Sequence, residues 1–513
     1  MLHESQIPKS CDLCYANKEK CERAPGRTDC ERCCRIGRPC ESKRRIKRPG
    51  RPPRRPLEGT RPQGAAANAS SAGIEGQGRQ LCRKSRPAMA AYPPNRGRDI
   101  SSSTWRNVLT VTHDLTDSQL SLLYRTVHQP DFVLQFLLGP TFCLPQRDKL
   151  VLHLLSSRAT VLDGYLACAL SFDTTCREDQ LTARLQMNNG FKHAAAALRT
   201  LRSLSAAGDG LEMASCLILG CQLLHFAIKI GGGELIDICA QALSSVTPHL
   251  EAEKGPFDPA YSSFLTSLVM TETSEGFFKT RMPSFRLDEE AVKRFPVDGA
   301  IGISVSLLTP LHDLAVVNVE MWQEFQQKQQ RKRSADSSTS TDAETSSTPS
   351  SSSSPSLMDR LDEVEHRIQQ WQPRVPEDLS TKYTATEVMH MMCQAQIMRL
   401  AGLLVAHRLR HPFGEEDDAA RAISSTILSQ LDMAAAVTGK VPRCIDLPLI
   451  VSCMELEDDD DRRRRLSTFS SIGRYSGRFQ QRIWGLIELV WAARRKPSRL
   501  HWYQLGQVIA SIP

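Results

Sequence analysis

The sequence predicts a small cysteine-rich module at the N-terminus, a flexible basic linker and a large all-α region. Three observations support this division of the 513 residues. First, seven of the 17 cysteines lie between Cys11 and Cys40. Second, residues 42–104 are rich in Pro, Gly, Ser and Arg and have no hydrophobic period, so they are predicted to lack a packed core. Third, apolar residues after position 104 recur at spacings of three and four, whereas strand-like alternation is scarce.

Changes in composition along the chain mark the predicted segments. A run of Ser and Thr interrupts the helical pattern and is predicted to be disordered, because it cannot bury a core. The predicted segments are the cysteine module (1–41), the basic arm (42–56), the linker (57–104), a helical region (105–330), the Ser/Thr-rich insertion (331–356) and a C-terminal helical region (357–513).

Helices are expected wherever the apolar spacing is sustained, and residues 455–465 are expected to form an exposed loop or helix end. Asp117 can cap the first helix, which Pro130 would stop. Residues 132–138 form a short apolar segment that ends at Gly139-Pro140. The expected helical stretches cover 117–127, 149–155, 160–172, 191–204, 211–230, 235–246, 303–325, 357–371, 387–410, 419–437, 482–495 and 502–512.

The formal net charge of +8 is concentrated at one end of the chain. Residues 1–56 carry 16 Lys and Arg against 7 Asp and Glu, a net charge of +9, so the rest of the chain is close to neutral. This distribution is typical of a nucleic-acid-binding head on a neutral body.

Several protein classes are not indicated by the sequence. The motifs of serine hydrolases, P-loop proteins, zinc proteases and dinucleotide-binding folds are missing, and His407 and His411 are interpreted as structural, so no enzyme is predicted. The most apolar stretch, residues 211–230, contains Glu212 and Lys229 and is interpreted as a core helix, not a membrane span. Residues 1–10 lack the apolar core of a secretory signal, which predicts a reducing compartment.

The cysteine spacing predicts a structural site for two zinc ions. A gap of two residues followed by a gap of six (x2-x6) separates three successive cysteines, and this pattern occurs twice. The cysteines are Cys11, Cys14 and Cys21 in the first half and Cys30, Cys33 and Cys40 in the second. Thiolates suit tetrahedral zinc. Two four-coordinate ions need eight ligand positions, so two of the six thiolates must bridge both ions. Disulfides would explain an even number of cysteines but not the repeat. Cys34 breaks the repeat and is interpreted as a spare thiol.

This pattern resembles the binuclear zinc cluster of fungal transcription factors. The resemblance implies that Cys11 and Cys30 bridge, that one ion also takes Cys14 and Cys21, and that the other takes Cys33 and Cys40. It further implies sequence-specific binding to double-stranded DNA in the nucleus. Lys18 matches the residue that reads a GC-rich triplet in the major groove. The predicted phosphate contacts are Lys20, Arg23 and Arg27.

The sequence departs from the family pattern close to the predicted reading residue. Tyr15, Ala16 and Asn17 occupy positions that are usually basic, and Glu19 places a carboxylate near the phosphates. Pro25 lies earlier than the proline that usually precedes the fourth cysteine. The cluster alone is therefore expected to bind DNA weakly.

The basic arm is expected to add DNA contacts. Eight of the thirteen residues from Lys43 to Arg55 are basic and none is acidic, and residues 48–52 resemble a degenerate AT-hook. Insertion into the minor groove, phosphate contact and nuclear import are all interpretations of this arm, and they do not exclude one another. The arm residues predicted to contact DNA are Lys43, Arg44, Arg45, Lys47, Arg48 and Arg51.

Three segments of the helical region, 136–145, 391–396 and 407–414, look like the fungal-specific regulatory domain, especially of secondary-metabolite gene-cluster regulators. This resemblance implies partners in the transcription machinery. Residues 41–103 have no apolar heptads, so a homodimer is expected to form through the helical body. Two alternative functions are a non-catalytic chromatin or repressor scaffold and an enzyme with a zinc-bound targeting head.

The Ser/Thr-rich insertion contains Thr348-Pro349 and Ser354-Pro355, pairs that proline-directed kinases accept. Phosphate there would add roughly −1.5 to −2 charges per site. The insertion is interpreted either as a regulatory segment or as a passive spacer.

Overall fold

The chain forms two compact units, Met1–Ala90 and Ala91–Pro513. The computed structural model describes residues 11–16, 21–22, 29–36, 40, 102–128, 136–174, 180–204, 210–230, 232, 234–251, 261–293, 295–337, 356–467, 477–495 and 499–510. Within these ranges the protein is mostly helical and contains no strand. One isolated bridge joins Asp298 and Gly302. This agrees with the predicted all-α region, whereas the predicted linker lies almost wholly outside the described residues.

The described part of the first unit contains two short helices, α1 (Asp12–Ala16) and α2 (Glu31–Arg35). Each helix begins directly after a cysteine of the predicted repeat, Cys11 and Cys30. The buried side chains here are cysteines, because so short a segment has few other apolar residues to form a core.

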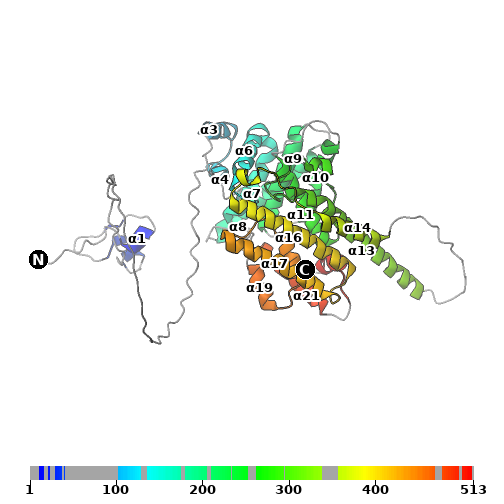
Figure 1. Cartoon of the computed structure of the whole chain (residues 1–513). Helices are drawn as coiled ribbons and strands as arrows, with labels where there is room; N and C mark the ends of the chain where they lie inside the picture. The colour runs from blue at the N-terminus through cyan, green and yellow to red at the C-terminus, as the bar shows by residue number, and fades with distance from the viewer. Residues whose placement is uncertain are drawn as a thin grey trace, which may run out of the picture. The chain divides into compact units, whose positions relative to one another are not determined.

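The first half of the second unit is a bundle of helices that pack around α9 (Figure 1). Its first core collects apolar side chains from α6 to α10 and from the first turns of α11. The helices are α3 (Ser102–Val111), α4 (Asp117–His128), α6 (Pro140–Ser156), α7 (Arg158–Thr174), α8 (Gln180–Ser203), α9 (Gly210–Ile230), α10 (Leu235–Glu251), α11 (Ser262–Lys279) and α12 (Glu289–Lys293).

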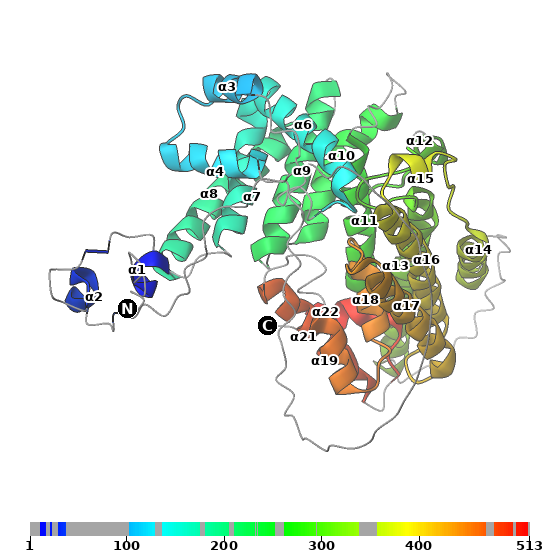
Figure 2. The ribbon, with the colours of Figure 1, turned by 60° about the vertical axis from the view of Figure 1, so that its left-hand side comes forward.

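The second half forms a second core, in which the long helices α13, α16 and α17 lie side by side (Figure 2). Its elements are η2 (Val305–Leu307), α13 (Leu308–Ser337), α14 (Leu357–Gln370), α15 (Leu379–Lys382), α16 (Ala385–Arg410), α17 (Asp417–Thr438), α18 (Asp446–Cys453), α19 (Asp459–Ser467), α21 (Gly477–Arg494), η3 (Trp502–Gln504) and α22 (Leu505–Ala510).

Helix α11 connects the two cores. Its early residues Leu265 and Leu268 are buried in the first core, and its late residues Phe277 and Phe278 are buried in the second. Met270, between them, contacts both cores. The two halves of the second unit therefore share one central helix.

Two helices, Leu211–Ile230 and Ala385–Arg410, are long and apolar enough to cross a membrane. In the most apolar window of each helix, 83% and 61% of the residues are buried inside the protein. Burial against other helices is the behaviour of core helices, which agrees with the interpretation of residues 211–230 as a core helix.

Local sequence signals account for several helix boundaries. The Ser356 hydroxyl oxygen accepts a hydrogen bond from the backbone N–H of Asp359, and the Asp359 carboxylate accepts one from the backbone N–H of Ser356. Together these bonds form a capping box at the start of α14. Thr384 and Glu387 form the same arrangement at the start of α16. Helix α14 begins at Leu357, where the helical pattern of the sequence was expected to resume.

Other boundaries differ from the prediction. Helix α6 begins at Pro140, since proline is favourable at the first helical position and does not stop a helix there. Helix α13 continues past the predicted break at Arg331 to Ser337, because Gln, Lys and Arg are good helix formers. The rest of the predicted insertion, residues 338–355, lies outside the described residues.

The acidic and basic run at 455–465 was expected to be an exposed loop or helix end. Residues 457–460 are exposed at the start of a helix, but the first residue of the run is buried. Glu455 is 1% exposed, and both its oxygens accept hydrogen bonds from Arg408, at 2.8 and 2.6 Å. Asp459–Ser467 forms α19, where acidic residues pair with arginines three positions later. The reason is a tertiary contact: the buried Arg408 of α16 needs a carboxylate partner, and Glu455 supplies it.

Candidate metal centre

Two cysteines of the first unit, Cys11 and Cys30, directly precede its two short helices. Cys30 is the N-cap of α2, and its sulfur accepts a hydrogen bond from the backbone N–H of Cys33 at 3.4 Å. Cys11 precedes α1 in the same way and accepts from the N–H of Cys14 at 3.4 Å. The two-residue gap thus places both sulfurs of each pair on one turn.

The second spacing of the repeat also has matching geometry in both halves. The backbone N–H of Cys11 donates to the sulfur of Cys21 at 3.3 Å, and that of Cys30 donates to the sulfur of Cys40 at 3.2 Å. The duplicated spacing in the sequence therefore corresponds to a duplicated backbone arrangement.

The six sulfurs form two groups of four that share two members. Within each group, all sulfur atoms lie within 4.8 Å of one another. The groups are Cys11, Cys14, Cys21 and Cys30, and Cys11, Cys30, Cys33 and Cys40. The shared cysteines, Cys11 and Cys30, are those that the resemblance implies as bridging ligands.

The distances between these sulfurs fit tetrahedral zinc. Cys11 Sγ lies 3.9 Å from Cys30 Sγ and 3.7 Å from Cys33 Sγ, and Cys14 Sγ lies 3.6 Å from Cys30 Sγ. A Zn–S bond of about 2.3 Å in tetrahedral geometry separates two sulfurs by about 3.8 Å. A disulfide needs about 2.05 Å, and the six cysteines are free thiols. The residues present therefore fit zinc and do not fit cystine bridges.

Electrostatics favours the thiolate form, which binds metal, at the two shared cysteines. The backbone N–H of Cys33 lowers the pKa of the Cys30 thiol to about 6. Burial raises the pKa of Cys11, but hydrogen bonds from Cys14 and neighbouring thiols outweigh burial and lower it. Burial raises the pKa of Cys14 to about 12. Cys11 and Cys30 thus lose their protons most readily.

Cys34 belongs to neither group of four. It is exposed, whereas Cys33 beside it is fully buried. The spacing of the repeat likewise leaves Cys34 out of the predicted ligands.

None of the predicted DNA contacts falls within the described part of the chain. Their placement, and that of the basic arm, stays a prediction. The residues concerned are Lys18, Lys20, Arg23, Arg27, Lys43, Arg44, Arg45, Lys47, Arg48 and Arg51.

The helical unit identifies the family of the chain. Residues 141–508 match the family described as the fungal specific transcription factor domain. The chain belongs to this family. No curated protein and no solved structure matches it. The matched residues cover α7 to α21 completely and lie after the cysteine module, so membership in the fungal specific transcription factor domain family rests on the helical unit alone.

Membership makes the chain a regulator of transcription and implies a nuclear protein. It also suggests a non-enzymatic role. The rings of His407 and His411 lie with centroids 4.9 Å apart. His407 Nε2 contacts the carbonyl oxygen of Glu416 at 3.1 Å, where the ring can donate a hydrogen bond. This contact fits a structural role for His407.

Proposed function

We propose that the protein is a zinc-dependent, sequence-specific DNA-binding transcription factor that regulates transcription by RNA polymerase II. The observation that carries the proposal is the pair of four-sulfur groups that share Cys11 and Cys30. The family of the helical unit supports the regulatory part of the proposal.

Two zinc ions would be held by the six cysteines of the repeat, with Cys11 and Cys30 common to both. Zinc would supply structural cross-links that the short helices lack, since metal binding provides the folding free energy of such small modules. The backbone N–H groups of Cys14 and Cys33 hold the shared sulfurs in the thiolate form by donating to them. This arrangement joins α1 and α2 into one rigid module.

The proposed reading of DNA depends on a lysine within the module and on the basic arm that follows it. Lys18 follows α1 closely, and we assign it the contact with guanine in the major groove. The basic arm at 42–56 would add phosphate and minor-groove contacts, because the changes around Tyr15 and Glu19 weaken the cluster by itself.

Selection of bound sequences from a random DNA pool by the full chain tests this function. Enrichment of a GC-rich triplet that disappears on adding a zinc chelator would support it. Binding without any sequence preference would instead support the scaffold alternative, and activity on a substrate would support an enzyme.

Replacement of Lys18 should reduce sequence discrimination. We expect Lys18→Ala to lower the preference for selected over scrambled DNA by about 1–3 kcal/mol, because one base contact is lost. Fluorescence anisotropy with both DNAs measures the change. As a control, Arg48→Ala with Arg51→Ala should weaken binding to both DNAs alike and reduce the salt dependence. Equal weakening of both DNAs by Lys18→Ala would show that it contacts only phosphate.

We also propose that the targets are genes of a secondary-metabolite cluster, supported by the resemblance of residues 136–145, 391–396 and 407–414. In the structure these segments contribute buried side chains, among them Leu138, Gln394 and Arg408. Transcript profiling of a strain without the protein tests this assignment. Unchanged transcripts across all such clusters would contradict it.

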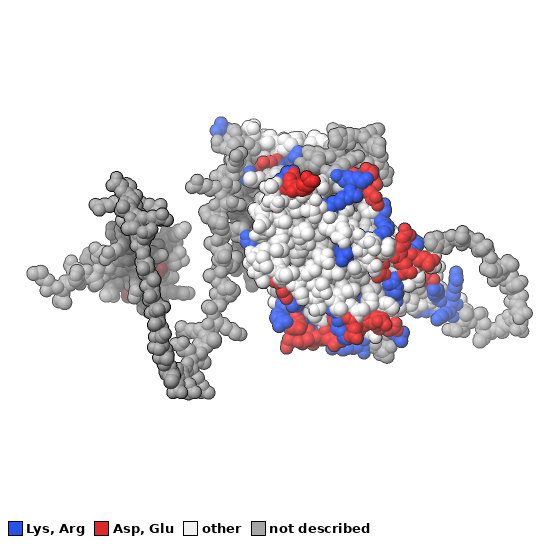
Figure 3. All heavy atoms as spheres, in the orientation of Figure 1, with Lys and Arg blue, Asp and Glu red and all other residues white. Residues whose placement is uncertain are grey.

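The homodimer predicted through the helical body is part of the proposal. The face of this unit that carries α16 and α17 has few charged side chains (Figure 3), and Met389, Met392, Met433 and Val437 are exposed on these helices. A two-fold axis brings the same patch of both copies together, so an uncharged patch meets no like charge. We expect Met433→Lys with Val437→Lys to convert a dimer to a monomer in sedimentation equilibrium. A monomeric wild-type chain would refute the assignment.

A further inference from the structure

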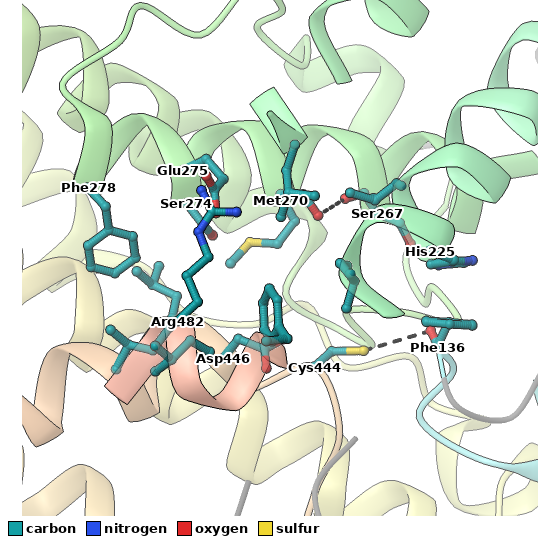
Figure 4. A pocket seen from close by; sticks show the side chains of 18 of the residues that line it. Phe136, His225, Ser267, Met270, Ser274, Glu275, Phe278, Cys444, Asp446 and Arg482 are labelled. Atoms are coloured by element: carbon teal, nitrogen blue, oxygen red, sulfur yellow. Dashed lines mark hydrogen bonds between the residues drawn. The ribbon is translucent and has the colours of Figure 1, made fainter. Parts of the chain in front are cut away.

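A cavity of about 180 Å³ lies inside the helical unit where its two cores meet (Figure 4). It is lined by α9, α10 and α11 on one side and by α18, α21 and α22 on the other. Most of its lining is apolar, including Ile228, Met270, Phe278, Ile301, Leu447 and Ile483. An apolar protein cavity of about 150 Å³ can bind benzene, so this volume is enough for a small ring compound.

A smaller pocket of about 40 Å³ adjoins the cavity. The two share the side chains of Phe136, His225 and Ser267 in their walls. The rings of Phe136 and His225 are stacked, and they lie together at one end of the cavity (Figure 4). The combined space is therefore mainly apolar between two ends that carry polar groups, and Glu275 and Arg482 line the end away from His225.

The smaller pocket is lined by a buried carboxamide without a partner. Gln222 is 5% exposed, and neither its Oε1 nor its Nε2 has a hydrogen-bond partner among the described residues. A buried polar group without a partner costs free energy. Gln222 and His225 lie three residues apart on α9, hence on one face of that helix.

The charge state of this end favours a neutral ligand. Burial, with a smaller contribution from Lys229, lowers the pKa of His225 to about 3, so its ring is uncharged at neutral pH. Toward the other end, the Glu275 carboxylate already pairs with Lys279 at 2.9 Å. A carboxamide both donates and accepts hydrogen bonds, and a hydroxyl group can satisfy it in both ways.

We propose that this cavity binds a small, uncharged, mainly apolar molecule with one hydroxyl group, such as an alkyl phenol. The apolar body occupies the larger cavity, and the hydroxyl group reaches Gln222 in the smaller pocket. Because its walls come from both cores, such a ligand joins the two halves of the helical unit and stabilises the folded state in proportion to its occupancy. This inference is independent of zinc and DNA binding.

Calorimetric titration of the full chain with 4-propylphenol and propylbenzene tests the proposal. The wild type should bind 4-propylphenol about two- to tenfold more tightly than propylbenzene, because one net hydrogen bond changes a dissociation constant by about that factor. Gln222→Met keeps the length of the side chain but removes the carboxamide, so it should abolish this preference and leave propylbenzene binding unchanged. Gln430→Met, on α17 and outside both pockets, should keep the preference.

Two further measurements separate binding from folding. Gln222→Met should unfold at the same or a higher temperature than the wild type, because an unpaired buried polar group is removed. Met270→Trp places a larger side chain in the larger cavity, so it should weaken the binding of both compounds alike. Absence of binding by the wild type, or an unchanged preference for the phenol in Gln222→Met, would overturn the proposal.

Discussion

Cys30→Ser is expected to remove both zinc ions from the full chain and to abolish specific DNA binding. Cys30 belongs to both four-sulfur groups, and its sulfur also caps α2. Structural zinc in small modules contributes about 10–16 kcal/mol of folding free energy, so the module should not fold without it. Elemental analysis of zinc per protein chain, together with anisotropy on the selected DNA, measures both effects.

Matched cysteine variants make this test specific. Cys34→Ser should keep two zinc ions and full DNA binding, because Cys34 is exposed and belongs to neither group. Cys40→Ser affects only one group directly and should lose less zinc than Cys30→Ser. Two zinc ions in purified Cys30→Ser, or equal losses in all three variants, would contradict the shared-ligand arrangement.

Glu455→Ala is expected to destabilise the helical unit by about 3–5 kcal/mol, because it leaves buried charges uncompensated. The Arg408 side chain is fully buried and also donates to Asp417 at 2.6 Å. A second guanidinium, that of Arg494, lies 3.3 Å from Glu455 and 3.2 Å from Asp417. Two cations and two anions thus form one neutral, largely buried cluster. Urea unfolding of the full chain measures the loss.

Glu457→Ala is the matched control, two positions along the chain. Glu457 pairs with Arg421 in an ion pair whose side chains are 62% and 40% exposed. Such surface pairs contribute about 0–1 kcal/mol. Similar losses of unfolding free energy in Glu455→Ala and Glu457→Ala would show that the buried cluster stabilises the protein no more than a surface ion pair does.

The pH dependence of this cluster has a definite sign. Burial raises the pKa of Asp417, but hydrogen bonds from Arg408 outweigh burial, so the pKa lies below its ordinary value of 3.8. A lowered pKa in the folded state stabilises the protein above pH 3.8, and this contribution is lost as the pH falls further. The cluster is therefore fully effective at neutral pH.

Sequence patterns predicted the structural features that depend on the spacing of residues close together in the chain. The two-residue gaps of the cysteine repeat predicted which sulfurs meet, because a gap of this length fits one turn of backbone. The capping boxes at Ser356 and Thr384 are also local, because each joins residues that lie three positions apart in the sequence. The apolar run at 211–230 predicted α9, since burial on all sides needs a helix apolar on all sides.

Features that depend on distant residues could not be predicted in this way. Helix α11 was missed because its buried face includes polar residues. Ser262, Ser263 and Thr266 all donate to the carboxylate of Asp298, which lies far along the chain. Likewise, the residues next to Glu455 in the sequence do not show that its carboxylate will pair with the buried guanidinium of Arg408. Satisfaction of buried polar groups is a property of the folded chain.

The shared central helix determines how the helical unit unfolds and how it responds to cleavage of the chain. Since α11 supplies side chains to both cores, neither half can open completely without exposing part of the other. The helical unit should therefore melt in a single calorimetric transition.

Cleavage of the chain within residues 338–355 would yield two fragments that stay associated and do not separate as two domains. The reason is that α11 and α13 on one fragment still pack with the helices of the other.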